Sequence, residues 1–160
     1  MTTNREKGYL WLIKDKTDIA AFPSPEIFES YIKAVLICAN GDGKVSPRER
    51  GWVVSHFAAL GAPDALLDEL NSYDADEDIE KTISATPVTD VSRYFLIYDA
   101  IRACSADEAF SDSERATVVR MAAKLGVPAE VVRQIEELVI EETQLREKRL
   151  KLLYPNGAPM

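Results

Sequence analysis

The sequence is poor in the residues that build nucleophilic catalytic sites and disulfide frameworks. It has one histidine, His56, and only two cysteines, Cys38 and Cys104, which lie far apart in the chain. Two such cysteines are not the framework of a disulfide-rich secreted domain. No Ser-His or Cys-His-Asp arrangement is recognisable, and no glycine-rich phosphate loop is present. We therefore predict that the protein is not an enzyme.

Basic charge and long apolar runs are also scarce. The 27 acidic residues outnumber the 19 basic ones, which gives a formal net charge of -8 and argues against nucleic acid as a partner. No run approaches the roughly 18 apolar residues of a membrane span, so none is predicted. The short apolar stretch GYLWLI is followed closely by charges, without a small-residue cleavage site, and we read no signal peptide. We expect a cytoplasmic protein with free thiols.

Helix signals, in contrast, are present along most of the chain. Apolar residues recur at spacings of three and four, which is typical of amphipathic helices. Serine caps, proline starts and glycine stops are predicted at Ser24, Ser46, Gly61, Pro63, Gly126 and Pro128. The sequence predicts an all-α bundle of about six or seven helices in one domain over residues 1–160. The first helix is expected to start at Ser24 and the last to extend to about residue 154.

The chain contains an internal repeat. When it is shifted by 65 positions, residues 42–63 align with residues 107–128, and ten of the 22 aligned residues are identical. Each copy consists of a helix, an acidic loop, a second helix, a glycine stop and a proline start. We expect two pseudo-symmetric helix-loop-helix units, at about residues 25–72 and about 88–140.

Packing and capping explain most of the identical pairs. Four pairs have core spacing, and in the first copy they are Val53, Val54, Ala58 and Leu60. Both copies also have the sequence of a capping box, with Ser46 and Glu49 in the first copy and Ser111 and Glu114 in the second. In such a box the serine accepts from the glutamate amide and the glutamate accepts from the serine amide.

The duplicated carboxylates allow a second interpretation. Asp42, Glu49, Asp107 and Glu114 would come close together if a pseudo-two-fold axis relates the copies. Four unpaired carboxylates repel one another, which raises their pKa values, and a hard cation would remove that penalty. Oxygen ligands favour Ca²⁺ or Mg²⁺ over Zn²⁺. These four residues are therefore predicted ligands of a divalent cation, and no other cofactor is predicted.

At these residues the sequence resembles a known family. ANGDGKVSPRE and its echo CSADEAFSDSE resemble the TerB-like domain associated with tellurite resistance, and the resemblance covers about residues 25–140. It implies an all-helical bacterial domain with an acidic metal site, carried over to Asp42, Glu49, Asp107 and Glu114. The second copy departs from the family pattern, because Glu108 replaces the usual glycine. The resemblance implies a part in tellurite resistance or a stress response.

An EF-hand is the rival pattern for the first acidic loop. With Asp42 at loop position 5, Gly43 and Glu49 fall on positions 6 and 12, as that motif requires. Cys38 would then stand at position 1, where a carboxylate is needed, and the second copy fits less well. A conventional calcium loop is therefore not predicted.

The remaining polar and sulfur-containing residues have structural interpretations. Cys38 and Cys104 precede the acidic loops, and core packing is favoured over contact with a soft ion. His56 is expected to pack or to lie at the surface. Asp99 and Arg102 are three residues apart on a helix and are predicted to pair.

The last helix leaves two functions open. Its leucines at 138, 145 and 152 follow a three-four pattern that Glu142 and Arg149 interrupt. The helix either packs across its own domain, or its basic end (residues 145–154) overhangs and pairs with another subunit, an acidic partner or a membrane surface. We expect a non-enzymatic, cation-binding module of a tellurite-resistance or stress-response system. The alternative is a protein-interaction or oligomerisation domain, with an unknown protein partner, whose acidic motifs are only helix caps.

Overall fold

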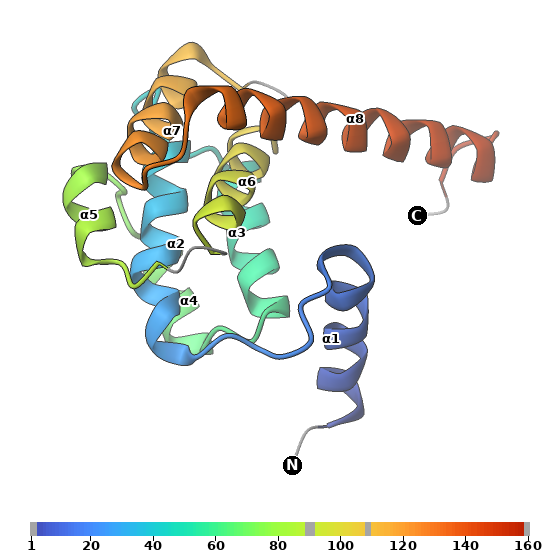
Figure 1. The fold of residues 1–160 in the computed structure, drawn as a ribbon. Helices are drawn as coiled ribbons and strands as arrows, with labels where there is room; N and C mark the ends of the chain where they lie inside the picture. Colours follow the sequence, from blue (N-terminus) through green and yellow to red (C-terminus); the bar gives the residue numbers. More distant parts are fainter. Residues whose placement is uncertain (1–2, 89–91, 108–109, 159–160) are drawn as a thin grey trace.

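The computed structural model describes residues 3–88, 92–107 and 110–158. Within these residues the chain forms eight α-helices and no β-strand (Figure 1). They are α1 (Asn4–Thr17), α2 (Pro25–Ala39), α3 (Pro47–Ala59), α4 (Asp64–Leu70), α5 (Ile79–Ala85), α6 (Ser92–Cys104), α7 (Asp112–Lys124) and α8 (Ala129–Leu153). The predicted all-α fold class is confirmed.

Helix α1 is the element that the sequence analysis missed. It begins with a capping box between Thr3 and Glu6, but none of its residues is buried. Hydrophobic periodicity reports on burial, so a helix without a buried face gives a weak signal. Tyr9, Trp11 and Leu12 are all exposed on it.

The two helices that precede the acidic loops form the centre of the bundle. Helix α2 packs against α3, α5, α6 and α7, and α6 packs against α2, α3, α7 and α8. Buried apolar residues from every helix between α2 and α8 form one hydrophobic cluster. The acidic loops therefore begin at the C-terminal ends of the two central helices.

Glycine ends α3 and α7 in the same way. Gly61 and Gly126 have φ angles of 85° and 71°, in the left-handed region that glycine adopts without strain. After Gly61, the Ala62 amide donates to the Phe57 carbonyl at 2.9 Å, and Val127 makes the equivalent bond to Ala122 at 2.9 Å. Both ends are Schellman motifs, as the glycine stops predicted.

The predicted core positions of α3 and α7 are only partly correct. Val53 and Val118 are fully buried, as expected. Ala58 and Ala123 are exposed, so their assignment to the core was wrong. In α3 the preceding residue, Phe57, fills the core instead. Ala58 and Ala123 lie one position, or about 100° of helix rotation, beyond the buried Phe57 and Ala122, which turns both toward solvent.

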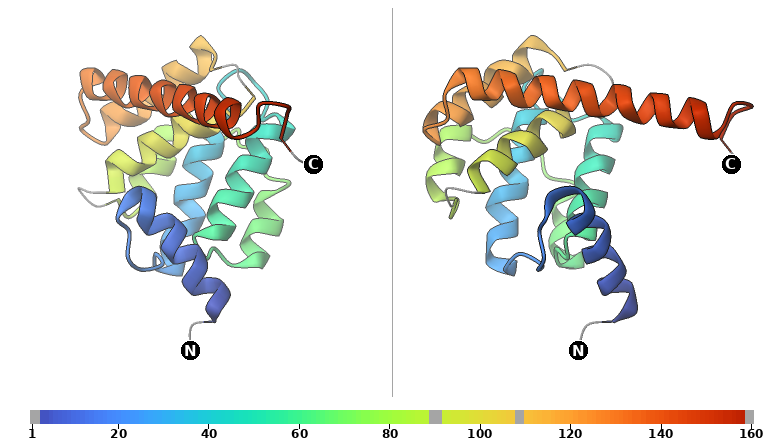
Figure 2. Two further views of the ribbon diagram at one scale, coloured as in Figure 1. Left: turned by 90° about the vertical axis from the view of Figure 1, so that its right-hand side faces the viewer. Right: turned by 45° about the vertical axis from the view of Figure 1, so that its right-hand side comes forward.

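Helix α8 is only partly supported by the bundle. Its first half packs against α6 and α7, and Val139 is its last buried residue. The remainder projects beyond the other helices (Figures 1 and 2). None of the helices described has both the length and the apolar character that crossing a bilayer would need.

Candidate functional site

Both predicted capping boxes are formed. The Ser46 Oγ accepts from the Glu49 amide at 3.2 Å, and the Glu49 Oε2 accepts from the Ser46 amide at 2.6 Å. Ser111 and Glu114 make the same two bonds at 3.2 and 2.7 Å. Each box uses one carboxylate oxygen and holds the side chain at the start of its helix.

The two capping glutamates are also the most deeply buried acidic residues of the described chain. Glu49 and Glu114 are 2% and 1% exposed. Their side chains lie within hydrogen-bonding reach of each other, and the Glu49 Oε1 is buried without a hydrogen-bond donor. Two carboxylates cannot bond unless a proton or a cation lies between them. Burial, with the neighbouring Glu114, raises the pKa of Glu49 to about 7.

A close backbone contact brings these two helix starts together. Gly41, which follows α2, lies against the first turn of α7. A Cβ atom at position 41 would lie 2.6 Å from the Glu114 Cα and 2.9 Å from the Ser113 carbonyl oxygen. Only glycine allows this approach. The loop of the first repeat is thereby held against the capping box of the second.

The two predicted aspartates do not join the glutamates in a cluster. Asp42 is exposed, and its Oδ1 accepts from the Lys44 amide of its own loop at 3.2 Å. Asp107 is half-buried, and Glu108 lies outside the described residues. The part of the chain that the structure describes contains no group of three or more His, Cys, Asp or Glu side chains that could hold a metal. Ligation by all four carboxylates stays a prediction.

The duplicated arginines have different roles in the two repeats. Arg50 donates to the backbone carbonyls of Leu70, the last residue of α4, and of Tyr73, at 2.8 and 2.9 Å. Arg115 instead forms an ion pair with Glu136 of α8 at 2.6 Å. The identical arginines of the repeat therefore differ in role, since Arg50 caps backbone carbonyls and Arg115 forms an ion pair.

Both cysteines are core residues. Cys38 and Cys104 are fully buried, and the Cys38 Sγ lies 3.8 Å from the Met121 Sδ. Burial raises the pKa of the Cys38 thiol to about 12 and also raises that of Cys104. Soft-metal ligation needs a thiolate, so these thiols are poorly suited to it.

A buried polar cluster was missed by the sequence analysis. The Tyr31 hydroxyl donates to Asp99 Oδ2 at 3.0 Å, and the His56 Nε2 lies 3.3 Å from Asp99 Oδ1. The predicted pairing of Asp99 with Arg102 is wrong. The Arg102 guanidinium instead lies over the rings of Trp52 and Tyr98, at 5.1 and 5.2 Å.

This cluster joins α2, α3 and α6. A single acidic residue in the apolar stripe of α6 was the available signal for it. Asp99 is 6% exposed, and a buried carboxylate requires donors. Its partners Tyr31 and His56 come from other helices, and their positions could not be obtained from spacing along α6.

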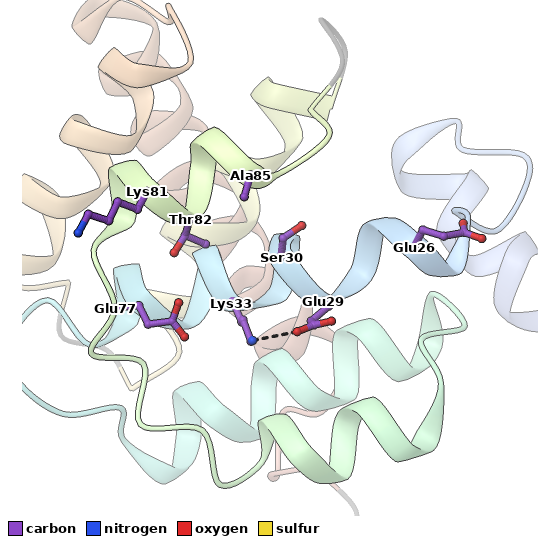
Figure 3. Close-up of a pocket in the computed structure, with 8 residues that line it drawn as sticks. All are labelled: Glu26, Glu29, Ser30, Lys33, Glu77, Lys81, Thr82 and Ala85. Atoms are coloured by element: carbon purple, nitrogen blue, oxygen red, sulfur yellow. Dashed lines mark hydrogen bonds and ion pairs between the residues drawn. The ribbon is translucent and has the colours of Figure 1, made fainter.

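Two surface grooves lie away from the glutamate pair. The first has a volume of about 380 Å³ between α2 and α5 (Figure 3). Its lining residues are Glu26, Glu29, Ser30, Lys33, Glu77, Lys81, Thr82 and Ala85. Lys33 is already paired with Glu29 at 2.9 Å, so its charge is not free for a ligand.

The second groove has a volume of about 560 Å³ and is bounded by the end of α1, α6 and α8. Its lining combines aromatic and aliphatic side chains with a charged rim. The lining residues are Lys14, Asp15, Lys16, Thr17, Asp18, Tyr94, Phe95, Tyr98, Ile135, Leu138 and Glu142.

Comparison with known proteins identifies a structural relative of the chain. No protein-family model and no curated protein sequence matches the chain. The crystal structure of a tellurite resistance protein from Nostoc punctiforme PCC 73102 matches with a TM-score of 0.85 and 34% identity. The alignment covers 100% of both chains, which confirms the predicted TerB-like fold. The chain therefore belongs to this family of tellurite resistance proteins.

Proposed function

We propose that the protein is a non-enzymatic, cytoplasmic module of a tellurite-resistance or stress-response system, and that it binds a divalent cation between the two repeats. The similarity to a tellurite resistance protein supports the part in tellurite resistance. The contact between the buried carboxylates of Glu49 and Glu114 supports the cation. One oxygen of this pair, Glu49 Oε1, lacks a donor.

The chemistry of the pair suits a hard cation. Two buried like charges repel, and a proton or a metal ion between them removes the repulsion. Mg²⁺ is commonly held by one or two carboxylates together with water, so its binding requires the two glutamates to separate and admit the ion with its waters. Ca²⁺ takes more oxygen ligands, which Asp42 and Asp107 would have to supply. Zn²⁺ is disfavoured because the donors are oxygens and the nearby thiols are protonated.

Calorimetric titration of the chelator-treated protein with Mg²⁺, Ca²⁺, Mn²⁺ and Zn²⁺ at pH 8 tests this proposal. We expect Mg²⁺ or Ca²⁺ to bind with a dissociation constant below about 1 mM. The double variant Glu49→Gln, Glu114→Gln should abolish binding, because it removes both charges and keeps both side-chain shapes.

Two further variants sharpen the titration. Glu6→Gln changes an exposed capping box of the same geometry and should leave binding unchanged. Asp42→Asn combined with Asp107→Asn should weaken binding only if the aspartates are ligands. Undetectable binding of all four ions, or equal binding by the glutamate double variant, would refute the cation proposal.

A protein-interaction domain is the second candidate function. Exposed apolar side chains favour it: Trp11 on α1 is 65% exposed and Leu152 on α8 is 71% exposed. In this case the acidic motifs serve only as caps, and the glutamate pair is held together by a shared proton.

A further inference from the structure

The projecting end of α8 lacks the support that a helix of its length needs. From Ile140 to Leu153 none of its residues is buried. This segment is roughly 21 Å long at 1.5 Å per residue. Most helical stability in proteins comes from the packing of an apolar face, which this segment lacks in the single chain. Leu145 and Leu152 are nevertheless 57% and 71% exposed on it, so a contact that covers them would stabilise the segment.

Charge is divided along the same helix. Glu141 and Glu142 lie on the bundle side of Leu145, whereas Lys148 and Arg149 lie on the outer side. Within the described residues, neither of these two cations has a carboxylate partner in its own chain. The helix therefore presents an acidic and a basic block with an exposed leucine between them.

The order of charges and leucines along α8 is complementary to that of a second copy of the helix running in the opposite direction. With Leu145 opposite itself, Leu138 falls opposite Leu152, because both lie seven residues from Leu145 and share its helix face. Glu141 and Glu142 then face Lys148 and Arg149 of the second copy. Each pair occurs twice across a two-fold axis, so the two charged interruptions of the apolar stripe neutralise each other. We propose that the protein forms a homodimer by antiparallel pairing of α8, centred on Leu145.

The second groove supports the same occupant. Leu138 is 46% exposed and lines that groove with Tyr94 and Ile135. In the antiparallel dimer, Leu152 of the second copy reaches Leu138 and covers this apolar lining. Glu142, which accepts from the Tyr98 hydroxyl at 2.7 Å, lies at the rim and faces the second copy's basic block. The same antiparallel contact therefore covers both the apolar lining of the groove and the exposed leucines of the projecting helix.

A parallel arrangement is disfavoured by the same charges. It would place Glu141 and Glu142 against their own copies, and Lys148 and Arg149 against theirs, so like charges would face each other at both ends. A two-fold antiparallel contact closes on itself and leaves no unpaired end. The inference names the partner for the interaction function and does not depend on cation binding.

Sedimentation equilibrium of the full chain tests the dimer. We expect twice the 17.8 kDa chain mass at micromolar concentrations. Leu145→Asp should raise the dimer dissociation constant about tenfold or more, because it buries two like charges at the centre. Leu145 is exposed in the single chain, so the variant should still fold. Leu12→Asp, at an exposed leucine on α1, is the matched control and should remain dimeric.

Charge exchange and cross-linking then test direction and register. Lys148→Glu with Arg149→Glu should dissociate the dimer, and adding Glu141→Lys with Glu142→Lys in the same chain should restore it. Because Cys38 and Cys104 are buried, introduced thiols report on the contact alone. A mixture of Leu138→Cys and Leu152→Cys chains should form a heterodimeric disulfide.

Several results would overturn the inference. A wild-type chain that is monomeric at about 100 μM has too weak a contact to be specific. A dimer that Leu145→Asp leaves intact uses another surface. Self-cross-linking of each single-cysteine variant would show a parallel pair. A monomer whose basic helix end binds vesicles of anionic phospholipid would assign that end to a membrane surface instead.

Discussion

Glu49 and Glu114 combine two roles at the scale of the single residue. One oxygen of each carboxylate caps a helix, and the rest of each side chain lies in a nearly inaccessible contact with its repeat partner. Capping by itself requires no burial, as the exposed box of Thr3 and Glu6 shows. Burial of the pair therefore places a cost on ionisation that a capping role does not explain.

This burial predicts a pH-dependent stability. The folded pKa of Glu49 is raised from 4.5 to about 7, so the folded protein holds this proton more tightly than the unfolded chain. The free energy of unfolding should fall as the pH rises from about 5 to 7 and then level off. Glu49→Gln should flatten this fall and raise the free energy of unfolding at pH 8 by roughly 1–3 kcal/mol.

Urea denaturation at pH 5 and pH 8, with a chelator present, measures this effect. The glutamine keeps an oxygen for the Ser46 amide and can donate to Glu114, so capping is retained. Glu6→Gln is the control, because Glu6 is exposed and backbone hydrogen bonding to Thr3 lowers its pKa. Glu6→Gln should therefore not flatten the fall. An unchanged pH profile in Glu49→Gln would show that another group is responsible.

At the scale of the helix, the contact between the α2–α3 loop and α7 decides how the two repeats meet. Gly41 lies against the backbone of Ser113 and Glu114 with no room for a side chain. In the second repeat, Ala106 stands at the aligned position. The glycine that this contact requires is therefore not repeated in the second copy.

Gly41→Ala should destabilise the protein by about 1–3 kcal/mol, because the backbone of α7 has to move away. Gly51→Ala is the matched variant, since Gly51 lies inside α3 and a Cβ there meets nothing within 4 Å. That change should instead raise stability by roughly 0.5–1 kcal/mol, as alanine favours the helix. Thermal unfolding measures the change in stability of each variant relative to the unsubstituted protein. Equal effects of the same sign would contradict the packing described for Gly41.

At the scale of the whole molecule, the repeats share one core. The central helices α2 and α6 come from different repeats and pack directly against each other. Tyr31 and His56 of the first repeat also contact Asp99 of the second. Neither repeat retains its full buried surface when the other is removed.

We therefore expect one cooperative unfolding transition. Far-UV circular dichroism and the fluorescence of Trp52, observed in a Trp11→Phe background, should give the same denaturation midpoint. Circular dichroism follows all helices, and Trp52 lies against His56 and Arg102 between the repeats. Two separate midpoints would show that the repeats unfold independently.

The sequence by itself determined the helices from α2 onward and several of their ends. Serine caps, proline starts and glycine stops depend on backbone geometry within a few residues. Such local signals can therefore be recognised in a single sequence. The internal repeat predicted two helix-loop-helix halves, and it identified Glu49 and Glu114 as equivalent residues. Helix α1 could not be predicted in this way. It has no buried face, so its apolar residues do not recur at helical spacing.

The tertiary structure decided which side chains meet. Two glutamates from distant capping boxes are brought together, while Asp42 turns into its own loop. Asp99 contacts Tyr31 and His56 on other helices instead of the nearby Arg102. Contacts between helices depend on how their surfaces pack, which spacing along one helix does not encode. Local hydrogen bonding therefore sets the helices of this protein, and long-range packing sets its site.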